Sequence, residues 1–231
     1  MPNGKTLSLY SIFRSINGEI NVSGQGSWAT FIRFSGCNLN CSWCDTEYAK
    51  SSNKESSDHF NMTVPKILET VEHLKCSNVT VTGGEPLFQR KGLEELLEVL
   101  VRNRFKVSIE TNGSYPIIPN MKVSWVVDYK LPSSGESHRM NVLDYWWYQL
   151  TPDDYIKFVI ADRYDYDLAL TVMQKLWSGG SLAQMLFSPL NRSDDKSNFI
   201  NTLYRWMQEN QLFAVGLNLQ LHKLVNLDEP K

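Results

Sequence analysis

The chain has 231 residues, with 23 lysines and arginines against 25 aspartates and glutamates, so its net charge is -2. This balance argues against a nucleic-acid-binding protein or a protein of anionic membrane surfaces, because both carry a basic excess. No apolar run approaches the roughly 18 residues of a membrane span, and residues 1–5 lack the apolar segment of an export signal. We therefore expect one cytoplasmic domain spanning residues 1–231.

Short β-branched and aromatic segments alternate with segments of helical periodicity along the chain. The predicted strands are residues 29–34, 79–82, 106–110, 123–128, 156–160, 184–187 and 215–221. Helices are predicted over residues 67–74, 93–101, 168–176 and 200–207, where apolar side chains recur every three or four positions. This β-α-β alternation indicates parallel strands joined by helical crossovers.

Roughly six such units are too few for a closed eight-fold barrel of about 250 residues. The predicted fold class is therefore α/β, a partial, open (β/α)6-type TIM barrel with its site at the carboxyl ends of the strands. Two polar stretches interrupt the alternation. Residues 50–61 are interpreted as a solvated loop, and residues 132–139 as a flexible loop that could act as a lid.

The cysteines carry the most specific signal. Cys37, Cys41 and Cys44 form a C-x3-C-x2-C loop directly after the strand predicted at 29–34, whereas Cys76 ends a predicted helix. Four thiolates would close a structural zinc site or saturate a four-iron cluster. Three leave one iron of such a cluster open to a substrate or cofactor.

Two other interpretations of this loop are weaker. A zinc knuckle would need a distant fourth ligand such as His59 or His73, whereas structural zinc ligands usually come as two pairs. A redox pair of Cys41 and Cys44 would leave Cys37 without a role. Cys76 is interpreted as a core residue.

The cysteine loop resembles the signature of the radical S-adenosylmethionine (SAM) superfamily, which implies a radical SAM type of barrel. In that superfamily the three cysteines bind a [4Fe-4S] cluster, and the open iron chelates SAM. One-electron reduction of SAM gives a 5′-deoxyadenosyl radical that abstracts hydrogen from the substrate. The cofactor carries the chemistry, and the protein binds and orients it.

Further segments match this superfamily in order. Residues 83–86 (GGEP) resemble the segment that contacts the SAM amino group, and residues 110–113 (ETNG) match the next strand end. By this resemblance the expected SAM contacts are Gly84, Glu85, Asp128, Tyr129, Lys130, Ser188 and Asn191.

The lead-in segment at residues 12–19, together with residues 31–39, 44–49 and 220–223, looks like the 7-carboxy-7-deazaguanine synthase family. Three positions depart from that family's pattern: Asn17 replaces Gln, Ile20 replaces Gly, and residues 128–130 (DYK) replace the commoner SPK.

The resemblance implies that 6-carboxy-5,6,7,8-tetrahydropterin loses a hydrogen from C6, contracts its ring and releases ammonia, giving 7-carboxy-7-deazaguanine for queuosine or another deazapurine. Thr46 would coordinate Mg2+, and Arg33 would pair with the substrate carboxylate. The other expected substrate contacts are Ile16, Asn17, Gly18 and Thr82. The expected partners are a reductant such as flavodoxin and a second copy in a homodimer. Trp146, Trp147 and Trp206 could pack at that interface or equally in the core.

One alternative within the superfamily is a glycyl-radical-enzyme activating protein, which uses the same cluster and SAM but acts on a protein glycine. The lead-in at 16–19 and the Cys-Asp-Thr sequence at 44–46 are not typical of that class. An alternative from another class is a non-catalytic zinc-binding module.

Overall fold

The computed structural model describes residues 6–50, 59–190 and 196–225. Its nine strands form one sheet in the order β3-β1-β2-β4-β5-β6-β7-β8-β9. The strands are β1 (Thr6–Ile16), β2 (Trp28–Phe34), β3 (Phe60–Thr63), β4 (Asn78–Gly83), β5 (Lys106–Thr111), β6 (Ser124–Tyr129), β7 (Tyr155–Ile160), β8 (Gln184–Pro189) and β9 (Gly216–Leu217). β2 and β4 to β9 run parallel, whereas β1 is antiparallel to both β2 and β3. Since β3 and β9 lie at opposite ends of this order, the parallel sheet is open, as predicted.

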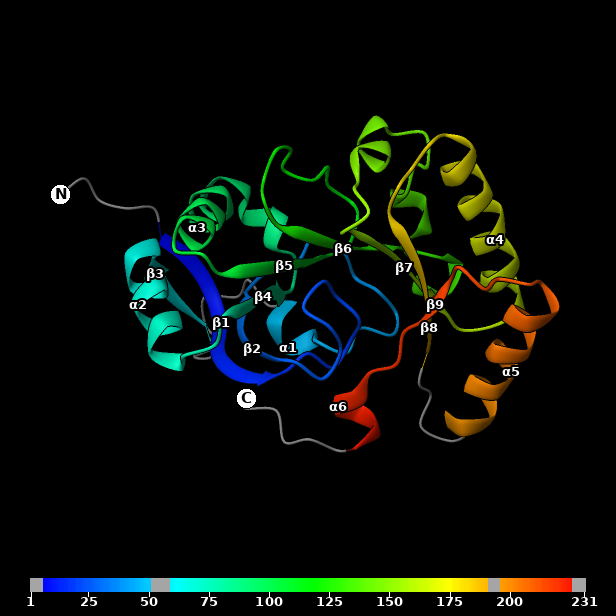
Figure 1. The fold of residues 1–231 in the computed structure, drawn as a ribbon, viewed down its shortest axis with the longest axis horizontal. Helices are drawn as coiled ribbons and strands as arrows, with labels where there is room; N and C mark the ends of the chain where they lie inside the picture. The colour runs from blue at the N-terminus through cyan, green and yellow to red at the C-terminus, as the bar shows by residue number, and fades with distance from the viewer. Residues whose placement is uncertain (1–5, 51–58, 191–195, 226–231) are drawn as a thin grey trace.

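The helices flank this sheet. They are α1 (Glu47–Lys50), α2 (Val64–Leu74), α3 (Arg90–Arg102), α4 (Arg163–Ser178), α5 (Lys196–Glu209) and α6 (Leu221–Leu224). In Figure 1, α2 and α3 lie beside one end of the sheet and α4 and α5 beside the other, while α1 and α6 lie near the middle. Among the described residues no helix has the length and apolar character needed to cross a membrane.

The predicted helices and six of the predicted strands are confirmed, because their apolar stripes fill the core. Leu93, Leu96, Leu97 and Leu100 of α3 are fully buried. The strand predicted over residues 215–221 is wrong beyond Leu217. Asn218 turns its side chain to accept a hydrogen bond from the Ile20 backbone amide (2.7 Å), and the chain then enters α6.

Two strands were not anticipated. β1 buries Leu7, Leu9 and Phe13 and pairs with β2, and β3 pairs with the outer edge of β1. The loop predicted at residues 50–61 is bounded by α1 and β3, so Lys50 is helical and Phe60 and Asn61 are in a strand. Residues 51–58 lie outside the described residues.

The segment after β1 closes the amino-terminal end of the sheet. Ile20 and Val22 pack against Val126, Tyr155 and Leu186 from three neighbouring strands. The departure at Ile20 from the family pattern is therefore a packing feature.

The three tryptophans, for which an interface and the core were both open, pack in or against the core. Trp147 is fully buried and stacks on Trp146, with ring centroids 4.0 Å apart. Trp206 packs against Tyr166 at 5.3 Å. These aromatic side chains therefore hold α4, α5 and the segment before β7 together.

Candidate active site

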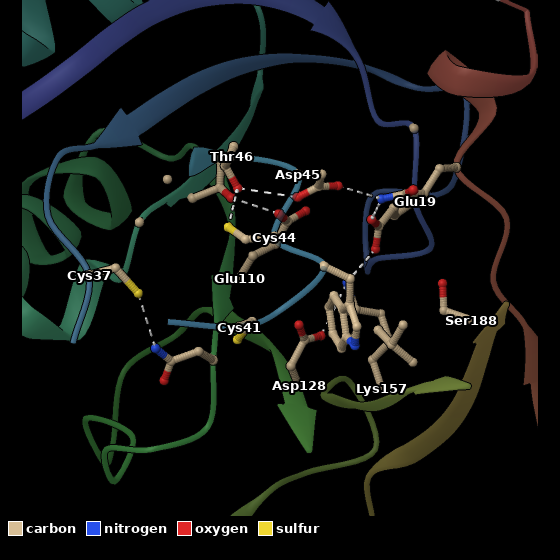
Figure 2. A pocket seen from close by; sticks show the side chains of 18 of the residues that line it. Glu19, Cys37, Cys41, Cys44, Asp45, Thr46, Glu110, Asp128, Lys157 and Ser188 are labelled. Atoms are coloured by element: carbon tan, nitrogen blue, oxygen red, sulfur yellow. Dashed lines mark hydrogen bonds and ion pairs between the residues drawn. The ribbon is translucent and has the colours of Figure 1, made fainter. Parts of the chain in front are cut away.

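A cavity of about 1160 Å³ opens at the carboxyl ends of the parallel strands. Each of six adjacent strands from β2 to β8 contributes at least one polar side chain to its lining, among them Arg33, Thr82, Glu110, Asp128, Lys157 and Ser188. Figure 2 shows four of these, together with the three cysteines, around one open space. A polar cavity thus lies at the predicted location of the site, the carboxyl ends of the strands.

The three cysteines of the loop lie on one side of this cavity. All three are free thiols and half-buried, and their sulfur atoms face the same space (Figure 2). The Cys37 sulfur accepts hydrogen bonds from the Leu39 amide (3.5 Å) and the Asn112 side chain (3.7 Å). The fourth cysteine, Cys76, is buried away from the cavity, as expected.

This donor set suits a cluster better than a single zinc ion. Three thiols spread around a cavity instead match a cluster that takes one thiolate on each of three irons. Burial raises the pKa of the Cys37 and Cys41 thiols, so cluster binding would displace their protons.

The prediction that residues 132–139 form a flexible loop that could act as a lid is wrong. Residues 132–139 form two short 3-10 turns that pack against the cysteine loop. Ser42 donates from its amide to the Ser134 carbonyl (3.0 Å) and from its hydroxyl to the Ser133 carbonyl (2.6 Å). The Glu136 carboxylate accepts the Asn40 amide (2.6 Å). This segment therefore supports the cysteine loop.

The glycine pair after β4 is required by a close approach of two backbones. Gly83 has φ +131, and a Cβ there would collide with the Phe34 backbone. A Cβ at Gly84 would collide with the Gly36 carbonyl oxygen, although Gly84 also lines the cavity. The two glycines thus fix the start of the cysteine loop as well as leaving room for a ligand.

Glu85 does not face the cavity, in contrast to the expected contact with SAM. It is fully buried, and its carboxylate accepts hydrogen bonds from the Leu87 amide (2.8 Å), the Thr111 hydroxyl (2.9 Å) and the Asn112 amide (2.7 Å). Burial raises its pKa to about 7. Glu85 therefore positions Asn112, which contacts the Cys37 sulfur.

Asn17 and Tyr129 also lie away from the cavity. The Asn17 side chain donates to the Ser27 hydroxyl (2.9 Å) and accepts from Thr80 (2.7 Å), so it stabilises the lead-in turn. Tyr129 packs between Trp147 and Phe158 in the core. Asn191 lies outside the described residues. The other predicted site residues line the cavity, namely Ile16, Gly18, Arg33, Cys37, Cys41, Cys44, Thr46, Thr82, Gly84, Asp128, Lys130 and Ser188.

A buried ionic cluster lies across the cavity floor. Lys157 contacts Glu19 at 2.5 Å and Asp128 at 3.2 Å, and Lys130 contacts the other Asp128 oxygen at 2.7 Å. Although burial opposes ionisation, Lys157 lowers the pKa of Glu19, and Lys130 and Lys157 together lower that of Asp128. Sequence reasoning did not select Lys157, although a lone lysine inside an apolar strand is a signal of such a site.

Glu110 faces the cavity, and among the described contacts no cation forms a hydrogen bond with its carboxylate. It accepts a hydrogen bond from Thr82 (2.7 Å). Burial, followed by the negative charge of Glu19, raises the pKa of Glu110 to about 7. This carboxyl group can therefore accept or donate a proton near neutral pH.

Arg33 and Thr46 lie on the same side of the cavity. The Arg33 guanidinium is placed over the rings of Phe13 and Tyr48, each 5.6 Å away, which orients it toward the space. The Thr46 hydroxyl lies 3.2 Å from the Asp45 carboxylate. Two oxygen donors at the edge of the cavity form a partial ligand set for a hard cation that also binds substrate and water.

The C-terminal segment completes the cavity. Lys223 pairs with Asp45 at 2.5 Å, and Gln220 donates to Glu19 at 2.7 Å. A Cβ at Gly18 would collide with the His222 ring, so glycine allows this segment to pack against the lead-in. The lead-in and C-terminal motifs, which are 200 residues apart in the chain, thus form one wall.

Comparison with known proteins supports the radical SAM assignment that the cysteine loop indicated. Residues 31–124 match the radical SAM superfamily. The fold is similar to that of QueE from Escherichia coli, with a TM-score of 0.71 and 20% identity over 93% of this chain and 94% of that one. It is also similar to SuiB from Streptococcus suis bound to S-adenosylmethionine, with a TM-score of 0.54 and 11% identity over 87% of this chain and 55% of that one.

Curated relatives match nearly from end to end. The 7-carboxy-7-deazaguanine synthase of Koribacter versatilis is 37% identical over 97% of this chain and 99% of its own length. That of Clostridium acetobutylicum is 36% identical over 92% and 93%. These matches do not favour the activating-protein alternative. The chain therefore belongs to the 7-carboxy-7-deazaguanine synthase family of radical SAM enzymes.

Proposed function

We propose that this chain converts 6-carboxy-5,6,7,8-tetrahydropterin to 7-carboxy-7-deazaguanine with ring contraction and loss of ammonia. The observation that carries the proposal is the pairing of three free thiols with a polar cavity in a member of this family. The cavity places cations, carboxylates and hydroxyls within one space. A pterin carboxylate and its N–H groups need such partners.

Cys37, Cys41 and Cys44 would hold the [4Fe-4S] cluster. Gly84, Asp128, Lys130 and Ser188 would contact SAM, a proposal supported by their place in the cavity lining. When bound, the cluster and SAM supply the radical that removes a hydrogen atom from the substrate. Lys130 lies 5.2 Å from the centre of the Trp43 ring and is held by Asp128. Its ammonium group is therefore placed beside the cysteine loop, where it can pair with a ligand carboxylate.

On the substrate side, Arg33 is held by two aromatic rings and is suited to a bidentate pair with the pterin carboxylate. Thr82, Ile16 and Gly18 line the same space, and Glu19 and Glu110 add acceptors for pterin N–H groups. Asn17 acts only through the turn that it stabilises. Because Asn17, which replaces the family's Gln, does not line the cavity, the neighbouring residues form this part of the cavity wall.

Magnesium is the third proposed cofactor. Thr46 and Asp45 supply oxygen donors at the cavity edge, and Mg2+ characteristically takes one or two protein ligands and keeps the rest for substrate and water. The substrate carboxylate would complete the set. Arg33 and the ion would then fix that carboxylate together.

A reductant such as flavodoxin, a homodimer and a cytoplasmic location belong to this proposal. Free thiols that must bind iron need a reducing compartment. Leu143 and Tyr145 are each 76% exposed and offer apolar surface for a second copy.

The test is anaerobic turnover of the reconstituted protein with SAM, dithionite and the tetrahydropterin, with and without Mg2+. We expect 7-carboxy-7-deazaguanine, about four irons per chain, and no SAM cleavage by Cys41→Ala. A brown, SAM-cleaving protein that leaves the pterin unchanged would contradict the proposed substrate. A colourless zinc protein would contradict the cluster.

A further inference from the structure

Lys157 occupies a central position in the cavity floor that the proposed function does not explain. It extends from the middle of β7, and its ammonium group lies 2.5 Å from Glu19 Oε2 and 3.2 Å from Asp128 Oδ1. All three side chains are largely buried, with 10%, 13% and 19% of their surfaces exposed. Figure 2 shows Lys157 between the other two.

The two carboxylates belong to different parts of the cavity. Glu19 is in the lead-in segment, beside Gly18 on the proposed pterin side, and is also held by Gln220 (2.7 Å) and Asn218 (3.1 Å). Asp128 is the penultimate residue of β6, lies on the proposed SAM side and holds Lys130 (2.7 Å). Lys157 is the cation that contacts both.

The negative charges of the buried carboxylates require a cation such as Lys157 between them. Two buried carboxylates close to a third, Glu110, repel one another unless cations separate them. Asp128 also stands where the family pattern carries serine, so this chain has one more negative charge to balance in the floor. Removing the shared cation would leave a carboxylate buried without its partner, which is costly and forces it to move or take up a proton.

We propose that Lys157 is a positioning residue. Its single ammonium group holds the Glu19 carboxylate in position to bind the pterin and the Asp128 carboxylate in position to bind SAM. This inference rests on the proposed function and deepens it. It assigns to a single side chain the alignment of the two ligands with each other. Neither ligand needs to touch Lys157 for it to act.

The test compares Lys157→Met, Glu19→Gln and Asp128→Ser as cluster-loaded enzymes. The Kd of SAM is measured by calorimetry without reductant, so that SAM is not cleaved, and pterin KM and kcat come from turnover. Lys157→Met is expected to raise both the SAM Kd and the pterin KM about tenfold, with kcat changed less than about threefold. Glu19→Gln should raise only the pterin KM, and Asp128→Ser only the SAM Kd.

The double variant Lys157→Met/Asp128→Ser separates positioning from a general structural effect. If Lys157 acts on SAM through Asp128, the double variant binds SAM within about threefold of the weaker single variant. Multiplied effects in the double variant would overturn the proposal, as would a Lys157→Met enzyme with unchanged SAM Kd and pterin KM.

Folding is controlled separately. Lys66→Met removes an exposed cation of α2 that pairs only with Glu69 among the described contacts, and it should leave all three constants unchanged. If Lys157→Met does not fold, Lys157→Arg replaces it. Retention of SAM binding within about threefold then supports the shared-cation role, and loss as large as expected for Met overturns it. Absence of deazaguanine product from the unsubstituted enzyme would refute the proposed function, while the SAM arm would still test Lys157.

Discussion

Glu85 should make the stability of the protein fall as the pH rises toward neutrality. Its carboxyl group is fully buried, and burial raises its pKa from 4.5 to about 7 despite three hydrogen bonds that favour the ionised form. Below pH 4.5 the group is protonated in both the folded and unfolded states. Between pH 4.5 and 7 the unfolded chain ionises freely while the folded state holds its proton, so the free energy of unfolding decreases.

The magnitude follows from the difference between the two pKa values, which is about 2.5 and corresponds to about 3 kcal/mol. Glu85→Gln cannot ionise, and its amide leaves one of the buried N–H donors of Leu87 and Asn112 poorly satisfied, at a cost of about 1–3 kcal/mol. The variant should therefore be less stable than the natural chain at pH 5. That deficit should shrink by about 3 kcal/mol, or reverse, by pH 8.

Urea unfolding of the cluster-free, thiol-reduced protein at several pH values measures this difference. Glu94→Gln is the matched control, because it makes the same chemical change at an exposed position of α3. Parallel pH curves for the natural chain and Glu85→Gln would refute the reasoning. They would mean that Glu85 is ionised in the folded state throughout this range.

Three further predictions concern the site. Gly84→Ala would force a methyl group against the Gly36 carbonyl, so we expect a loss of about 2–4 kcal/mol in unfolding free energy, measured in urea, and lower iron content after reconstitution. Glu110→Gln should remove an ionisation near pH 7 from the pH dependence of kcat/KM, and an unchanged profile would show that Glu110 does not titrate in turnover. Thr46→Ala should raise the Mg2+ concentration needed for half-maximal turnover by about tenfold while iron content stays constant, and an unaltered Mg2+ response would exclude Thr46 as a ligand.

Local sequence patterns predicted most of the architecture. Apolar periodicity identified α2 to α5, and β-branched runs identified β2 and β4 to β8, because each pattern reflects which face of one element is buried. β1 was missed although it buries Leu7, Leu9 and Phe13. β9 was predicted too long, since nothing local shows that Asn218 turns to hydrogen-bond with Ile20.

The polar loop at residues 132–139 shows the limit of composition. Serine, glycine and charged residues indicated a flexible lid, yet the same groups form hydrogen bonds with the cysteine loop nearly 100 residues earlier. Polar side chains are equally suited to water and to a partner loop. Only the folded chain shows which of these they meet.

The sequence by itself determined that three thiols, the proposed cluster ligands, share one short loop. The spacing of Cys37, Cys41 and Cys44 is a local property, because a short loop must bring three thiols to one space whatever surrounds it. The tertiary structure decided which polar residues face that space. Glu85 is directed inward and Lys157 joins two carboxylates from distant segments, because strand register and side-chain packing set these contacts, and neither can be read along the chain.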